Sequence, residues 1–315
     1  MSTVNGRYDV VCIGESMVLV TPANGQRLAD ARGAALTVAG AESTVALYLA
    51  DLGHRVRWLS RVGADPLGDH VLHEIGDGGV DVGLVARDPQ APTGVYFKDP
   101  APGDTSVYYY RAGSAASGLT EGDLDRFDPA TTKVVHLSGV TPALSSTCRA
   151  MTERLFTIGG EAGVLLSFDV NHRAALWEAA EAGPVLLDFA RRADVVFVGL
   201  DEANRIWGVR NPEDVYQHLG TGRTLVVKDS DVGATAFADG ARTFVPAEPV
   251  EVVEPVGAGD AFAAGYLSGL LRGWEQPARL RFGHRVAGLA LGTTADHVDA
   301  SVLRPDDAGE LEGGS

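Results

Sequence analysis

The chain has 315 residues, and 42 acidic against 26 basic side chains give it a formal net charge of −16. A protein that binds nucleic-acid backbones needs a basic face, but the basic residues here are scattered and their longest run is Arg191-Arg192. No stretch approaches the roughly 18 apolar residues of a membrane span, and residues 1–9 carry no apolar run of signal-peptide length. We therefore expect a soluble globular protein without nucleic-acid or membrane partners.

The cysteines and histidines offer little for redox or metal chemistry. Cys12 and Cys148 are too few for a disulfide framework, which predicts a reducing, cytoplasmic compartment. Cys148 has no histidine beside it on its predicted helix, so we expect a structural role. His70 and His73 lie three residues apart on a predicted helix, but no third ligand follows at metal spacing. A solvated helix face is the better interpretation.

Short apolar runs alternate with segments of helical spacing along most of the chain. The runs predict strands buried on both faces, at residues 10–13, 134–137, 164–168, 195–198 and 225–227. The predicted helices cover residues 42–52, 145–159, 184–192 and 201–207. This alternation predicts an α/β protein in which helices cover both faces of a mostly parallel sheet.

Two regions interrupt this alternation. Residues 17–38 and 93–111 alternate apolar and polar side chains around loop signals, which predicts antiparallel strands of a small second sheet. We interpret that sheet as a lid over the open edge of the large one. After Lys228, residues 234–238 and 242–245 predict a hairpin around Asp239-Gly240, and residues 260–272 and 277–291 predict two closing helices. The tail from residue 304 is acidic and glycine-rich, and we expect it to be disordered.

A glycine-rich turn, Glu254-Pro255-Val256-Gly257-Ala258-Gly259-Asp260, runs directly into an apolar helix. The backbone N–H groups of Gly257, Ala258 and Gly259 can converge there, and the helix dipole adds partial positive charge, so the turn predicts an anion hole beside Asp260. It lacks the Gly-Lys-Ser/Thr of a P-loop and the further glycine of a dinucleotide-binding fingerprint. Taken alone, the string is only slightly better explained by function than by an ordinary aspartate N-cap.

The same string resembles the second signature of the ribokinase-like (PfkB) carbohydrate kinases, and other segments follow in the family's order. Residues 39–46, Ala-Gly-Ala-Glu-Ser-Thr-Val-Ala, resemble its glycine-rich sugar signature, and residues 63–68 resemble the next family turn. Residues 109–116 and 169–177 are similar to the 2-keto-3-deoxygluconate kinase branch. The resemblance spans roughly residues 8–300 and implies a ribokinase-like three-layer α/β/α sandwich. It implies one kinase domain over residues 8–303, with lid segments at about 16–38 and 92–111 and a tail at 304–315.

The resemblance implies an ATP-dependent kinase that converts 2-keto-3-deoxygluconate to 2-keto-3-deoxy-6-phosphogluconate. In that reaction Asp260 would take the proton of the attacking hydroxyl, with Gly257, Ala258 and Gly259 at the transferring phosphoryl group. An unperturbed aspartate is a weak base. Positioning and charge-neutralising donors must then supply most of the catalysis.

For the sugar, the resemblance implies that Arg111 and Arg173 contact an acid group. Arginine presents a planar fork of donors that matches a carboxylate, and a neutral hexose has no need of one. Most arginines are solvated surface residues, but both of these follow predicted strands, and ligands of α/β sheets bind at strand ends. The resemblance adds four further residues to the same pocket: Gly40, Tyr96, Tyr109 and Asn171.

For the nucleotide, the resemblance points to Lys228, Ser230, Gly233, Gly257, Gly259 and His284, and for Mg²⁺ to Glu202. It leaves a monovalent cation open as a further cofactor. The chain departs from the family pattern at three positions. Ser230 stands where a glycine is usual, Gly199 where an asparagine precedes Glu202, and Thr44 where the sugar signature has an asparagine.

Several alternatives stay open. Within the kinases, the substrate could be the galactonate epimer or a neutral sugar, as in fructokinases and ribokinases. The three departures also leave a non-catalytic sugar- or nucleotide-binding protein on the same scaffold, since fold does not guarantee function. Finally, apolar lid strands such as residues 18–20 favour pairing across a two-fold axis, which predicts a homo-oligomer.

Overall fold

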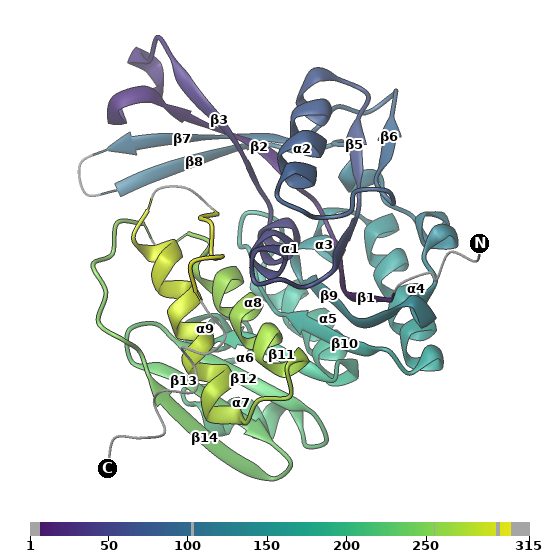
Figure 1. Ribbon diagram of the computed structural model, residues 1–315, viewed down its shortest axis with the longest axis vertical. Coiled ribbons are helices and arrows are strands. Elements are labelled where there is room, and N and C mark those ends of the chain that lie inside the picture. Colours follow the sequence, from purple (N-terminus) through teal and green to yellow (C-terminus); the bar gives the residue numbers. More distant parts are fainter. Residues whose placement is uncertain (1–6, 102–103, 255, 294–296, 304–315) are drawn as a thin grey trace.

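The computed structural model describes residues 7–101, 104–254, 256–293 and 297–303. Its largest element is an eight-stranded sheet (Figure 1). The strands in spatial order are β14 (Ala241–Pro246), β13 (Gly233–Ala238), β12 (Thr224–Asp229), β11 (Val195–Gly199), β10 (Leu165–Asp169), β9 (Thr132–Ser138), β1 (Tyr8–Ile13) and β4 (Val56–Leu59). From β4 to β12 all neighbours are parallel, and β13 and β14 add an antiparallel hairpin. The predicted mostly parallel sheet is confirmed.

Helices cover both faces of this sheet. One face carries α1 (Ala41–Asp51), α8 (Ala258–Leu271) and α9 (Gln276–Leu291), and the other carries α4 (Ser146–Ala162), α5 (Ala179–Arg192), α6 (Leu200–Trp207) and α7 (Pro212–Leu219). Along β1, Val10 and Cys12 belong to the core under α1 and α8, whereas Val11 and Ile13 belong to the core on the opposite face. The strand is apolar at successive positions because both of its faces are covered.

The second sheet has four strands and projects from the body as a lid (Figure 1). Its order is β3 (Ala34–Ala39), β2 (Met17–Pro22), β7 (Val95–Ala101) and β8 (Asp104–Tyr110). The pairs β2–β3 and β7–β8 are antiparallel as predicted, but β2 and β7 pair in parallel. The antiparallel strands predicted for the lid are thus confirmed in these two pairs, and the parallel pairing of the two central strands was not predicted. Both central strands enter the lid from the body, so they run in the same direction.

The structure also contains elements that the sequence patterns did not predict. They include β4, α7, the short helix α3 (Val140–Leu144) and a two-stranded sheet of β5 (Arg61–Gly63) and β6 (Ala86–Asp88). Helix α5 starts at Ala179, before the predicted start at Pro184, because Ala182 and Leu186 on one of its faces both pack into the core. The tail at 304–315 lies outside the described residues. Within the described residues, none of the helices has both the length and the apolar character needed to cross a membrane.

The parallel strands all end at one edge of the large sheet, and polar side chains gather there. Glu15 follows β1, Asp169 ends β10, and Lys228 lies near the end of β12. The lid emerges from the same edge, because β2 begins at Met17, just after β1. Ligands of α/β sheets bind at the carboxyl ends of the strands, so we expect the functional site at this edge.

Candidate active site

Two cavities meet at the strand ends. The larger, of about 530 Å³, lies between the lid and the body, and the smaller, of about 390 Å³, lies over the ends of β10, β11 and β12. Five residues line both cavities: Tyr109, Arg173, Val256, Gly257 and Asp260. A group transferred between ligands in the two cavities would therefore pass Asp260.

Asp260 lies in the first turn of α8, but it is not the N-cap. That position belongs to Gly257, which adopts a φ of 82° and makes no side-chain capping hydrogen bond. An N-cap role for Asp260 is thus excluded. The N–H groups of the first helical turn lack intrahelical acceptors, and with no capping side chain they are available to an anion.

The surroundings of Asp260 raise the pKa of its carboxyl group, which makes it a stronger base. Burial raises its pKa to about 7, with the positive charge of Arg173 acting in the opposite direction and Asp169 adding a like charge. The side-chain amide of Asn171 donates to Asp260 Oδ1 over 3.3 Å. This Asp260 is therefore a better base near neutral pH than the unperturbed aspartate that the sequence analysis assumed.

The smaller cavity holds a half-buried cation, Lys228, beside the glycine-rich turn. Lys228 Nζ lies 2.7 Å from Asp169 Oδ2. A Cβ added at Gly259 would lie 3.3 Å from the same Nζ, so the ammonium group sits against the start of α8. Burial alone would lower the pKa of Lys228, but the charges of Asp169 and Glu202 raise it. The lysine therefore stays cationic, as a phosphate contact requires.

Glu202 anchors the opposite wall of this cavity. Its Oε2 accepts the backbone N–H of Gly199 over 3.1 Å, and its Oε1 accepts the N–H of His172. Burial and the charge of Asp169 raise its pKa. Gly199 stands where the family has an asparagine. A Cβ built at Gly199 would lie 2.8 Å from Asp201 Oδ1, so the Asp201 carboxylate occupies that space.

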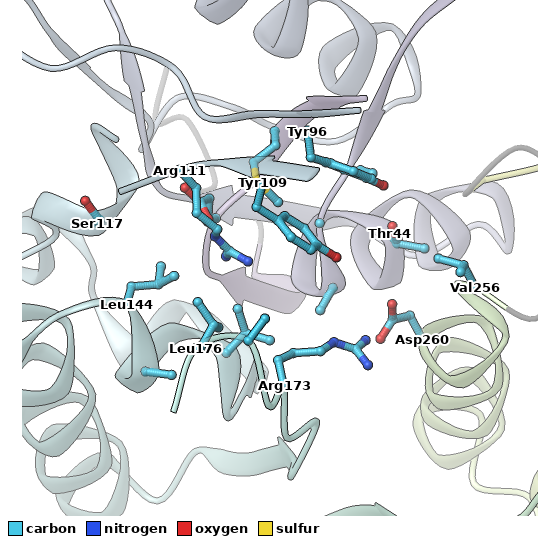
Figure 2. A pocket seen from close by; sticks show the side chains of 18 of the residues that line it. Thr44, Tyr96, Tyr109, Arg111, Ser117, Leu144, Arg173, Leu176, Val256 and Asp260 are labelled. Atoms are coloured by element: carbon cyan, nitrogen blue, oxygen red, sulfur yellow. The ribbon is translucent and has the colours of Figure 1, made fainter. Parts of the chain in front are cut away.

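The larger cavity is walled by the lid on one side and by α1 and the body on the other (Figure 2). Tyr96 and Tyr109 from neighbouring lid strands stack with their ring centroids 5.2 Å apart. Gly40 and Thr44 contribute the start of α1. A Cβ at Gly40 would lie 2.2 Å from the backbone oxygen of Glu15, so this close approach requires glycine.

The two arginines both line the larger cavity, but they do not converge. Arg111 is ion-paired with Glu15, whereas the guanidinium group of Arg173 extends toward Asp260 (Figure 2). Glu15 is 2% exposed and also accepts a hydrogen bond from Ser114 Oγ over 2.6 Å. Glu15 was not among the residues predicted for the site, although it lies two residues after the end of a predicted strand, and a position after a strand end is the signal that pointed to Arg173.

Three residues suggested for the nucleotide line neither cavity: Ser230, Gly233 and His284. A Cβ at Gly233 would lie 2.4 Å from Val245 O, so the glycine serves the close approach of β13 and β14. His284 packs edge-on against Phe262, with ring centroids 5.1 Å apart, and its Nε2 lies 3.3 Å from Val245 O. Ser230 adopts a φ of 40°, the region that favours the glycine it replaces.

His73 and the two cysteines line neither cavity. His73 pairs with Asp77 over 3.2 Å, and both side chains are 71% exposed. Cys148 is a buried free thiol on the core-facing side of α4. Within the part of the chain that the structure describes, no group of three or more His, Cys, Asp or Glu side chains could hold a metal ion.

Comparison with known proteins agrees with this geometry. The profile of the pfkB family carbohydrate kinases matches residues 7–300. The chain is 35% identical to the 2-dehydro-3-deoxygluconokinase of Bacillus subtilis (strain 168), over 92% of this chain and 91% of that protein. It is 31% identical to the 2-dehydro-3-deoxygalactonokinase of Haloferax volcanii, over 95% of each. The crystal structure of 2-dehydro-3-deoxygluconokinase from Thermotoga maritima superposes with a TM-score of 0.85 at 26% identity, covering 98% of this chain and 100% of that one. The chain therefore belongs to the pfkB family of carbohydrate kinases, enzymes that transfer a phosphoryl group to a hydroxyl group of a sugar.

Proposed function

We propose that this kinase phosphorylates the terminal hydroxyl of 2-keto-3-deoxygluconate with ATP, giving 2-keto-3-deoxy-6-phosphogluconate and ADP. The observation that carries the proposal is Asp260 at the junction of the two cavities, with Arg111 lining the larger one away from it (Figure 2). In the reaction the sugar oxygen attacks the γ-phosphorus, its proton passes to Asp260, and the bond to the β-phosphate oxygen breaks. The raised pKa of Asp260 suits that proton transfer.

The larger cavity is proposed to bind the sugar with its acid group at Arg111. Leu144 and Leu176 lie toward that side, whereas Thr44 and Val256 lie beside Asp260 (Figure 2). Binding energy at the remote acid group would orient the terminal hydroxyl toward the base, so it supports turnover as well as affinity. Because Arg173 lines both cavities, it is proposed to contact the reacting groups instead of the distant carboxylate.

The smaller cavity is proposed to bind the phosphates of ATP. Lys228 supplies a positive charge, and the first turn of α8, entered through Gly257 and Gly259, supplies backbone donors. Since the transferred group passes through a loose transition state, catalysis depends on positioning and on such charge-neutralising groups. Ser230, Gly233 and His284 have no proposed phosphate contact, because they lie outside the cavity.

The donor set of the smaller cavity fits Mg²⁺. Among the residues that the structure describes, two buried oxygens, Asp169 Oδ1 and Asn171 Oδ1, have no hydrogen-bond partner, and Glu202 lies across the same cavity. Protein Mg²⁺ sites commonly use one or two carboxylates together with substrate phosphates and water, so a complete protein cage is not needed. Bound there, the ion would neutralise phosphate charge; Glu202 would orient its waters, and Asp169 would hold Lys228 in place.

A panel of sugars tests the proposal. ADP release is measured with 2-keto-3-deoxygluconate, its galactonate epimer, fructose and ribose, and the highest kcat/KM is expected with one of the two acid sugars. A preference for fructose or ribose would replace the proposed substrate by a neutral sugar. Binding of ATP without turnover of any sugar would instead favour a non-catalytic protein.

The outer face of the lid is proposed to pair with a second copy of the chain. Register across the four strands places Leu36, Val20, Phe97 and Tyr108 in one row on that face. Leu36 is 49% exposed and Tyr108 is 47% exposed, so the row is open to solvent at both ends. Light scattering should give the mass of a dimer, and Leu36→Asp should give that of a monomer; a monomeric wild type would refute the pairing.

The compartment is proposed to be the cytoplasm. Both cysteines are buried free thiols, as expected in a reducing environment.

A further inference from the structure

A buried ion pair joins the lid to the body beside the sugar cavity. Lys98 lies on the lid strand β7, and Glu254 lies in the loop that leads to the start of α8. Lys98 Nζ is 2.7 Å from Glu254 Oε1, and the two side chains are only 3% and 16% exposed. The pair therefore connects two parts of the chain that are far apart in sequence but that form opposite walls of one cavity.

The neighbours of the pair show what it connects. Side chains alternate along a strand, so Lys98 points to the same face of β7 as Tyr96, which lines the larger cavity. Two residues after Glu254, Val256 lines both cavities and leads into Gly257. The backbone N–H of Val253 donates to Leu291 O over 2.8 Å, which attaches this loop to the end of α9.

We propose that Lys98 and Glu254 are positioning residues that hold the lid over the sugar cavity and, through the same contact, hold the segment that enters the anion-binding turn. Neither residue touches the reacting atoms, so neither is a catalytic residue. The inference rests on the proposed assignment of the larger cavity to the sugar. Through this ion pair, the position of the lid over the sugar is coupled to the position of the turn that binds the phosphoryl group.

The physical reason is the asymmetry of buried charge pairs. An intact buried pair contributes little net stability, because desolvation offsets its attraction, but removing one partner takes that attraction from the remaining charge and leaves its desolvation cost. In a variant that lacks one of the two charges, the remaining group loses this ion pair, and lifting the lid from the loop lets more water reach it. Removing both charges relieves that penalty, so the double variant should be less perturbed than the sum of the single variants.

The chain offers a matched control within the lid. Arg27 pairs with Asp99, the neighbour of Lys98 on β7, through hydrogen bonds of 2.9 and 2.6 Å. Asp99 is buried, but both partners belong to the lid region and the pair does not reach the body. Arg27→Met should therefore disturb the lid internally without releasing it from the loop at Glu254.

The first measurement needs no substrate. Amide hydrogen exchange is compared in wild type, Lys98→Met, Glu254→Gln, the double variant and Arg27→Met. Both single variants should exchange about tenfold faster or more in β7 and in residues 248–254, whereas Arg27→Met should leave residues 248–254 unchanged. Unchanged exchange in folded Lys98→Met and Glu254→Gln would refute the link, whatever sugar the enzyme uses.

The second measurement is kinetic. In each single variant, KM for the sugar should rise about tenfold, KM for ATP should change less than about threefold, and ATP hydrolysis relative to sugar phosphorylation should increase as water enters the cavity. The double variant should lose no more than the worse single variant. Strictly additive losses of activity in the double variant, or equal kinetic changes in Arg27→Met, would refute the link. The Lys98–Glu254 pair would then contribute only to the general stability of the fold. If wild type has no activity toward any sugar, the proposed function fails, while the exchange result still decides the link.

Discussion

The side-chain amide of Asn171 donates to Oδ1 of Asp260, and Asn171 itself adopts a φ of 40°. Few residues other than glycine tolerate this left-handed region, although asparagine does so more readily than most. Asn171 lies just after β10, so the unusual backbone turns its side chain from the strand end toward the start of α8. Backbone strain at one residue thus orients the proposed base.

Replacing that base should nearly abolish turnover. Asp260→Asn keeps the size of the side chain but cannot accept the hydroxyl proton, so kcat should fall by about 10²- to 10⁴-fold. A coupled ADP-release assay measures the loss, and calorimetric titration with ATP should show nearly unchanged binding in the same variant. Phosphorylation at the wild-type rate would mean that another group takes the proton.

The raised pKa of Asp260 predicts how activity depends on pH. The base must be ionised, so kcat/KM should fall about tenfold per unit as the pH drops below about 7. The profile is measured from pH 5 to 9 with the sugar well below KM. A plateau that extends down to pH 5 would contradict a base with this pKa.

The same shift predicts a stability effect with a defined sign. Burial raises the pKa of Asp260 in the fold to about 7 from the ordinary 3.8, so its ionised form disfavours the folded state. The contribution of this group to stability is present below pH 3.8 and is lost as the pH rises to about 7. Asp260→Asn should therefore melt at a higher temperature than wild type at pH 8, by a smaller margin at pH 5. Equal melting temperatures of Asp260→Asn and wild type at both pH 8 and pH 5 would contradict a raised pKa of Asp260 in the folded protein.

The acid group of the substrate is tested at Arg111. Arg111→Lys keeps the charge beside Glu15 but loses the planar fork of donors. Losing a hydrogen bond to a charged group costs about 1–3 kcal/mol, so kcat/KM for the acid sugar should fall roughly 5- to 150-fold. A neutral hexose should be affected far less. Arg173→Lys is the comparison, and because Arg173 reaches toward Asp260 it should impair both sugars (Figure 2). Equal losses of kcat/KM for both sugars in Arg111→Lys would show that the substrate carboxylate does not bind at Arg111.

Ser230 carries a conformation that suits glycine, and this gives a stability prediction. At a φ of 40° a side chain costs about 1–2 kcal/mol, whereas the extra freedom of unfolded glycine costs about 0.5–1 kcal/mol. Ser230→Gly should therefore stabilise the protein by about 0.5–1 kcal/mol, seen as a higher denaturation midpoint. Ser230→Ala, which keeps a Cβ, should give no such gain. A lower midpoint in the glycine variant would show that the serine hydroxyl contributes more than the backbone strain costs.

Local patterns were sufficient for the architecture and for part of the site. Doubly buried strands such as β1 are apolar at successive positions, and the glycine-rich string before Asp260 has a specific order, so both could be read without a structure. The lid strands were visible as alternation, but their central parallel pairing was not, because pairing depends on the direction from which each strand leaves the body.

Contacts between distant segments were decided only by the tertiary structure. Arg111 and Arg173 were both predicted to bind the sugar because each follows a strand. In the structure Arg111 pairs with Glu15, whereas Arg173 reaches toward Asp260 (Figure 2). The pKa of Asp260 follows from burial and from the charges packed around it, none of which its own sequence neighbours supply. Sequence by itself determined which residues could do chemistry, because residue type and local geometry are encoded within a few positions. The packing of lid against body determined which of them meet, because charge, burial and distance act through space.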